Sequence, residues 1–276
     1  MSPDQLIRGR YGLAPDAPLP FAPPNEVPPA LAAILDRRVT RRYRADAPVP
    51  EPLLGTLLAA AQSAPSKSDL QQYAIVVIQD AAKIAAIADW IGSMPWIKGA
   101  PVFLLFCGDV RRGRRVCATY GREHANDNVD TFLNATADAA LAMAHLILAA
   151  EMAGLGTCPV SYVRNHVERV APLLGLPRGV FPVAGLTLGW PAARNAPSPR
   201  LPQPVVVHRE RYDDGGLEAA LPGYDALRPP AKPRYPEVHG PRPEGCRWSE
   251  NSARQLSVPE RFGLRTWLRL QGLALD

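Results

Sequence analysis

The sequence predicts an α+β protein, because three short apolar runs typical of buried strands alternate with segments of helical periodicity. The strands are expected at residues 73–79, 101–109 and 181–190. A long helix is expected at residues 127–153. The chain has 276 residues, 47% of them hydrophobic and 21% charged, which is an ordinary globular composition with enough apolar residues for a sizeable core.

The elements before the long helix follow from proline positions and periodicity. Residues 1–29 are rich in proline and are expected to be extended. Helices are expected at residues 30–36 and 50–64, the second with Pro52 in its first turn, where a missing backbone N–H costs nothing. A short helix is expected at residues 80–90, between the first two strands.

The long helix is the most apolar element of the chain. Gly154 follows it and is expected to form its C-terminal cap. Residues 137–152 are apolar nearly all round, so the helix is expected to be buried on most faces. Later elements are expected as helices at 163–174 and 262–271 and as a short strand at 204–208.

The charge balance is mildly basic, with a net charge of +5 that comes mostly from arginine. A basic balance can indicate nucleic-acid binding. Here the aromatic residues are few and are not interleaved with the basic ones, so no nucleic-acid partner is expected. An anionic small molecule accounts for the charge equally well.

The cysteines point to neither a disulfide framework nor a metal site. Cys107, Cys117, Cys158 and Cys246 form no C-x-x-C pair and have no histidine at zinc spacing, so no metal is expected. Without a signal peptide, a reducing cytoplasmic location is expected. The longest apolar stretch, residues 139–150, is too short to cross a bilayer, so no membrane partner is expected.

Two polar segments are suited to hold a phosphorylated, polyhydroxylated molecule. Residues 37–43 read Arg-Arg-Val-Thr-Arg-Arg-Tyr, and guanidinium groups bind phosphate bidentately without losing their charge. Residues 63–73 read Ser-Ala-Pro-Ser-Lys-Ser-Asp-Leu-Gln-Gln-Tyr, which adds hydroxyl, ammonium and backbone N–H donors. Either segment by itself is more often a solvated helix face or an ordinary surface turn.

Two later segments favour the binding interpretation over the surface interpretation. Residues 153–160 read Ala-Gly-Leu-Gly-Thr-Cys-Pro-Val, and residues 173–191 run from Leu-Leu-Gly-Leu-Pro to Leu-Gly-Trp-Pro. In this order the four segments resemble the FMN-dependent nitroreductase family, most closely its branch of oxygen-insensitive NADPH nitroreductases and flavin reductases. The resemblance implies a three-layer α-β-α fold with a central mixed, mainly antiparallel sheet. It also implies an intertwined homodimer with FMN at the seam.

The resemblance divides the chain into a Pro-rich N-terminal arm at 1–30, an FMN-binding core at 31–212 and a C-terminal arm of the same domain at 213–276. It implies hydride transfer from NADPH or NADH through bound FMN to nitroaromatics, quinones or flavins by a ping-pong mechanism. Flavin chemistry needs no catalytic triad, and the sequence offers none. A non-reductase flavin protein is the alternative, either a flavin-consuming biosynthetic enzyme or a flavin-binding sensor.

The resemblance also assigns roles to individual residues. The arginines of the first motif would contact the FMN phosphate and pyrimidine side, and the late arginine would contact the phosphate. The serine-rich turn would approach the ribityl chain and ring, and the 158–161 segment would lie along the flavin near N5 and O4. The implied cofactor-binding residues are Arg37, Arg38, Arg41, Ser66, Lys67, Ser68, Cys158, Pro159, Val160, Ser161 and Arg200. The chain departs from the family pattern at Asp69, Tyr162 and Ser198, where the family has Asn, Gly and Lys.

Overall fold

The computed structural model describes residues 1–230 and 239–275. The chain forms two compact units. The first combines Met1–Arg38 with Ala196–Glu260, and the second combines Val39–Asn195 with Arg261–Asp276.

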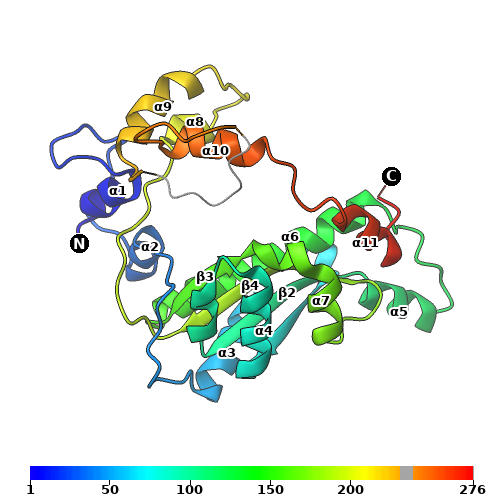
Figure 1. Ribbon diagram of the computed structural model, residues 1–276. Helices are drawn as coiled ribbons and strands as arrows, with labels where there is room; N and C mark the ends of the chain where they lie inside the picture. Colours follow the sequence, from blue (N-terminus) through cyan, green and yellow to red (C-terminus); the bar gives the residue numbers. More distant parts are fainter. Residues whose placement is uncertain (231–238, 276) are drawn as a thin grey trace. The chain divides into compact units, whose positions relative to one another are not determined.

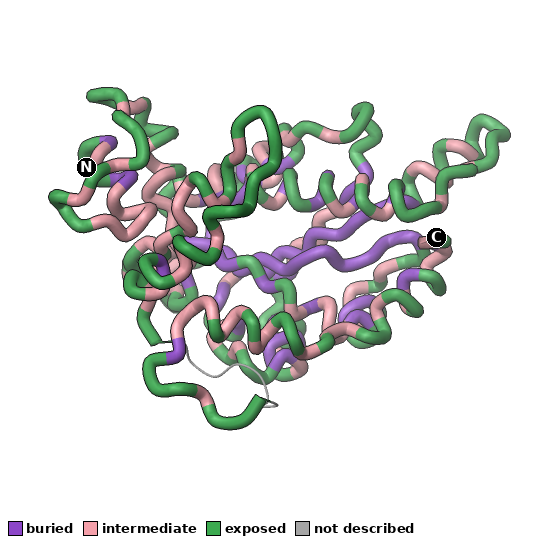
Figure 2. The backbone as a smooth tube through the Cα atoms, turned by 90° about the horizontal axis from the view of Figure 1, so that it is seen from above, coloured by how far each residue is buried: buried purple, intermediate pink, exposed green. Residues whose placement is uncertain are grey.

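The second unit is built on a four-stranded antiparallel sheet in the order β1-β2-β4-β3. Its strands are β1 (Tyr73–Ile78), β2 (Val102–Asp109), β3 (Gly156–Val160) and β4 (Val180–Gly189). Every residue of β2 and β4 is buried, and these strands run through the molecule as continuous buried stretches (Figure 2). The three expected strands are confirmed, whereas β3 was not expected.

Helices cover both faces of this sheet, which gives the three-layer α+β architecture (Figure 1). On one face α3 (Glu51–Gln62) and α6 (Val129–Met152) pack over a core that includes Leu104 and Phe106 of β2. On the other face α4 (Ala81–Ile91) and α7 (Val167–Leu173) pack over Phe103 and Leu105 of the same strand. Successive side chains of a strand point to opposite faces, so one apolar run supplies both cores.

The long helix α6 ends as expected. Gly154 has φ +85°, its N–H donates to the carbonyl of Glu151, and the N–H of Leu155 donates to the carbonyl of Ala150. This pair of bonds is a Schellman motif, which needs a residue in the left-handed region. The helix is also long enough and apolar enough to span a bilayer, which the shorter run 139–150 did not suggest. It lies instead against the sheet and α3 as a core helix of this unit.

The expected burial of α6 on most faces is wrong for the single chain. Ala135, Ala139 and Ala142 are fully buried against the sheet. Leu133 and Leu141 are 62% and 40% exposed on the opposite side. An apolar face of this helix therefore lies uncovered by the rest of the described chain.

The first unit corrects two expectations. The proline-rich N-terminus contains helix α1 (Pro3–Tyr11), because Ser2 and Gln5 form a reciprocal capping box and Pro3 fits the first helical turn. The expected strand at 204–208 is instead the short helix α8 (Gln203–Val206), which also has a proline in its first turn. Helix α2 (Pro29–Leu35) is confirmed.

The remaining elements are short and helical. The helix expected at 163–174 consists of the 3₁₀ turn η3 (Ser161–His166) followed by α7, and the helix expected at 262–271 is α11 (Leu264–Leu270). The others are η1 (Lys67–Asp69), η2 (Pro95–Gly99), α5 (Arg111–Thr119), α9 (Leu217–Ala226) and α10 (Trp248–Leu256).

Candidate functional site

The arginine-rich segment lies directly on strand β3. The N–H of Thr40 donates to the carbonyl of Thr157 at 2.9 Å, and Val39 forms a parallel bridge with the same residue. The approach is so close that a Cβ added at Gly156 would lie 2.2 Å from Oγ1 of Thr40. Glycine at position 156 therefore permits two segments far apart in the sequence to meet.

Tyr43 fixes the other end of this contact. Its hydroxyl donates to the carbonyl of Thr40 at 2.8 Å and lies 2.7 Å from Oγ1 of Thr187, on strand β4. Burial raises the pKa of the Tyr43 hydroxyl well above its usual range, and the hydrogen bond with Thr187 offsets this only in part. The hydroxyl therefore stays neutral and acts as a structural donor.

Arg41 lies on this braced segment and is exposed. Its guanidinium carbon is 5.7 Å from the ring centroid of Trp96 in η2, a cation–π distance. Within the described residues Arg41 pairs with no carboxylate. Its charge is thus oriented by Trp96 without being neutralised, and sequence reasoning did not anticipate Trp96.

The serine-rich turn is held by a buried carboxylate that sequence reasoning missed. Asp138 of α6 is 1% exposed. Its Oδ2 accepts from Oγ of Ser66 at 2.7 Å and from N–H of Gln72 at 2.9 Å, and its Oδ1 accepts from N–H of Lys67 at 3.1 Å. Oγ of Ser66 in turn accepts from N–H of Gln71 at 2.7 Å. The signal was Asp138 itself, an acidic residue in the middle of a largely apolar helix, where a buried carboxylate demands polar partners.

These bonds hold the turn in an unusual backbone conformation. Ser68, Asp69 and Gln71 have φ of 52°, 55° and 50°, in the left-handed region that residues other than glycine seldom adopt. Lys67 and Ser68 are exposed on this turn. The carboxylate of Asp69 is exposed too, and it accepts from Nε2 of Gln71 at 3.1 Å rather than from Lys67.

The 158–161 segment leaves few side chains accessible. Cys158 and Val160 are buried within β3, whereas Pro159 and Ser161 are exposed. Oγ1 of Thr187 also lies 3.3 Å from the carbonyl oxygen of Cys158, at the pairing of β3 with β4. Tyr162 is partly buried and packs against the core beneath α4 and α7.

The other implied residues, Arg37, Arg38 and Arg200, belong to the first unit. Arg38 forms an ion pair with Asp36. Arg200 is exposed and has no carboxylate partner among the described residues. Arg10 connects their segments, because it donates to the carbonyls of Leu35, Arg37 and Ser198 and accepts through its own carbonyl from N–H of Arg200. Sequence reasoning did not single out Arg10.

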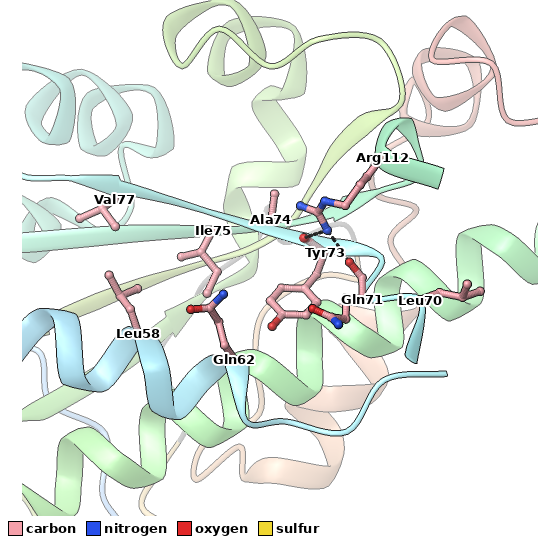
Figure 3. Close-up of a pocket in the computed structure, with 9 residues that line it drawn as sticks. All are labelled: Leu58, Gln62, Leu70, Gln71, Tyr73, Ala74, Ile75, Val77 and Arg112. Carbon is pink, nitrogen blue, oxygen red and sulfur yellow. Dashed lines mark hydrogen bonds between the residues drawn. The ribbon is translucent and has the colours of Figure 1, made fainter. Parts of the chain in front are cut away.

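Two cavities lie beside these segments. One, of about 640 Å³, runs between α3 and the edge strand β1, and Arg112 points across it and donates to the carbonyls of Gln71 and Tyr73 at 2.5 and 3.0 Å (Figure 3). It contains none of the implied cofactor-binding residues. The second, of about 680 Å³ and mainly apolar, lies in the first unit and is lined by Arg200 together with Tyr11 and Gly12.

Within residues 1–230 and 239–275, no three His, Cys, Asp or Glu side chains are grouped as metal ligands. All four cysteines lie in that part of the chain, and none forms a disulfide.

Comparison with known families gives two adjoining matches. The description "Nitroreductase family" matches residues 34–190, and "Nitroreductase family, C-terminal domain" matches residues 198–276.

Individual relatives agree. The chain is 37% identical over 204 residues to an "FMN reductase [NAD(P)H]" of Bacillus subtilis, which covers 73% of this chain and 80% of the relative. It is 31% identical to an "Oxygen-insensitive NADPH nitroreductase" of Salmonella typhimurium, over 89% of this chain and 98% of the relative. Among solved structures, the NADPH:FMN oxidoreductase from Vibrio harveyi complexed with NAD+ superposes with a TM-score of 0.77 at 27% identity, covering 90% of this chain and 99% of that one.

Proposed function

Because the chain belongs to the nitroreductase family, we propose that it is an FMN-dependent oxidoreductase that takes a hydride from NADPH or NADH and passes it to a nitroaromatic, a quinone or a free flavin. The observation that carries the proposal is the contact between the arginine-rich segment and β3. This contact brings Val39 and Thr40 against Thr157, although the two segments are distant in sequence, and it supports the assignment of Arg41 and the Cys158–Val160 stretch to one site.

The donor chemistry fits a flavin mononucleotide. Arg41, Lys67 and Arg200 carry cations that pair with no carboxylate in the described chain, which suits a dianionic phosphate. The exposed hydroxyl of Ser68 suits a polyhydroxylated ribityl chain. The buried carboxylate of Asp138 accepts from the backbone N–H of Lys67 and not from its ammonium group.

When bound, the flavin supplies hydride acceptance and donation, so the chain has to bind, orient and shield. Arg38 and Arg200 of the first unit and, taken separately, Arg41 of the second are the candidates for binding the phosphate, and Arg38 also pairs with Asp36. The turn held by Asp138 would present Lys67 and Ser68 to the ribityl chain. A backbone N–H group of the 158–161 segment, in which Pro159 offers none, would orient the ring.

We also propose that two copies form a homodimer through α6. The uncovered side of this helix carries Leu133 and Leu141, eight residues apart, together with exposed alanines. Alanines let two helices approach closely, and the leucines gain from burial. The exposed alanines are Ala137, Ala140 and Ala144.

The unbridged thiols suit a reducing cytoplasm, and we place the enzyme there.

Two measurements test the proposal. Titration by fluorescence quenching should give FMN bound at about one per chain. FAD should bind much more weakly, because the site would clamp the phosphate at the end of the ribityl chain. Steady-state kinetics with NADPH and a nitroaromatic, a quinone or a flavin should give parallel double-reciprocal lines, as a ping-pong mechanism requires. FMN binding without turnover of any acceptor would favour the non-reductase flavin protein instead, and a failure to bind FMN would refute both.

A further inference from the structure

The N-terminal helix α1 lies between two segments of the first unit that carry implied phosphate ligands. Nη2 of Arg10, in its last turn, donates to the carbonyls of Leu35 and Arg37 at 2.7 Å each. Nη1 of the same side chain donates to the carbonyl of Ser198 at 3.3 Å. The N–H of Arg200 donates back to the carbonyl of Arg10 at 2.9 Å. Arg10 therefore connects residues 35–37 with residues 198–200 within the first unit.

Packing reinforces these bonds. Gly12 caps α1 with φ +68°, and a Cβ added there would lie 3.1 Å from Cγ of Pro199. The helix itself is well defined, because Ser2 and Gln5 form a capping box. The segment that precedes Arg200 therefore lies against a fixed helix end.

A second arginine of the same helix, Arg8, makes different contacts. Arg8 pairs with Asp4 at 2.7 Å and donates to the carbonyls of Ala14 and Ala17 at 2.8 and 2.6 Å. Its contacts hold the N-terminal arm to itself and do not reach the residue 35–38 or 198–200 segments. Arg8 is therefore a matched control for Arg10.

We propose that Arg10 is a positioning residue for phosphate recognition, which holds the backbones of Arg37 and Arg200 so that the side chains of Arg38 and Arg200 converge on the terminal phosphate of the cofactor. The inference rests on the proposed function. The Arg10 guanidinium faces backbone carbonyls, so it acts through the neighbouring arginines rather than as the principal phosphate ligand. A planar guanidinium suits this role because it can span several carbonyls in one rigid geometry.

The test compares FMN with riboflavin, which lacks the phosphate, in fluorescence-quenching titrations of the full chain. Arg10→Ala should weaken FMN about tenfold, comparable to the loss of one charge-assisted hydrogen bond, and leave riboflavin affinity unchanged. Arg10→Lys should fall between wild type and Arg10→Ala, because an ammonium can reach some but not all of the carbonyls. Arg8→Ala should leave both affinities at the wild-type level. Urea midpoints of all variants are measured alongside.

The outcomes distinguish a failure of this inference from a failure of the proposed function. Equal weakening of FMN and riboflavin by Arg10→Ala would show a merely structural role and overturn the inference. Wild-type FMN affinity in Arg10→Ala, together with loss of FMN in Arg200→Ala, would overturn the inference and leave the proposed function intact. If wild-type protein binds neither flavin, the proposed function fails and this inference fails with it. If Arg10→Ala does not fold, the same comparison is made with Arg10→Lys, where unchanged discrimination against riboflavin counts against the inference.

Discussion

Replacement of Asp138 tests whether the serine-rich turn is held from α6. The carboxylate accepts three hydrogen bonds, from Oγ of Ser66 and from the backbone N–H groups of Lys67 and Gln72. In Asp138→Asn one of the two oxygens becomes an NH₂ group. Whichever oxygen is replaced, one backbone N–H then faces another donor, because Lys67 and Gln72 bond to different oxygens.

The structure sets the magnitude. A buried N–H left without an acceptor costs about 1–3 kcal/mol, so Asp138→Asn should lower the free energy of unfolding by about that amount. Asp138→Ala leaves two such groups, for a loss of about 2–6 kcal/mol. Removing a 1%-exposed carboxylate also relieves its desolvation cost, so we expect the lower half of that range.

Urea unfolding and FMN titration check this pair of variants. FMN affinity should fall along with stability, because the φ values near 50° of Ser68 and Asp69 need the turn to be held. Asp130→Asn is the control, since Asp130 is exposed on the same helix and accepts only from Nδ2 of Asn134 among the described residues. Asp138→Asn with wild-type stability and wild-type FMN affinity would refute the reasoning.

Three further predictions follow from other features. Gly156→Ala should lower the free energy of unfolding by about 1–3 kcal/mol in urea, because the new Cβ would lie 2.2 Å from Thr40. The control Gly55→Ala on α3, where nothing lies within 4 Å, should be neutral or stabilising, and an equal loss of stability in both variants would contradict the close approach at Gly156. Leu141→Glu should shift light scattering from dimer to monomer with the urea midpoint little changed, because Leu141 is 40% exposed in the single chain; a variant that remains dimeric argues against the α6 interface. Burial raises the pKa of the Cys107 thiol from 9.0 to about 12. The unfolded chain therefore loses this proton first as pH rises, and stability should fall between pH 9 and 12 at up to about 1.4 kcal/mol per pH unit; Cys107→Ala should flatten that decline, and an unchanged slope would show that the thiol is not responsible.

Much of the sheet and its covering helices could be predicted because the signal was local. The apolar run of β2 fills both cores, so its composition alone marks a strand buried on both faces. Gly154 marks the end of α6 through a backbone conformation that glycine favours. Strand β3 was missed because it contains Pro159 and only five residues, and because it is defined by pairing with the distant β4 and not by its own composition.

In the candidate site, too, local motifs could be predicted and tertiary contacts could not. The arginine and serine-rich segments were visible as motifs, but the groups that position them were not. Asp138 lay in a helix interpreted as apolar nearly all round, and Arg10 lay in an arm expected to be extended because of its proline content. The Ser-x-x-Gln pattern at Ser2 was a capping signal that could have revealed α1. The contacts of Arg10 with the 198–200 segment depend on tertiary packing, which no local pattern encodes.

Anaerobic mixing of the FMN-loaded protein with NADPH, and separately with NADH, tests the central claim most directly. Rapid loss of the visible flavin absorbance, followed by its return on addition of a nitroaromatic, a quinone or free flavin, is the result predicted for a chain that binds FMN and passes a hydride through it. Protein that binds FMN stoichiometrically but keeps its oxidised spectrum with both nucleotides would contradict the assignment as a reductase.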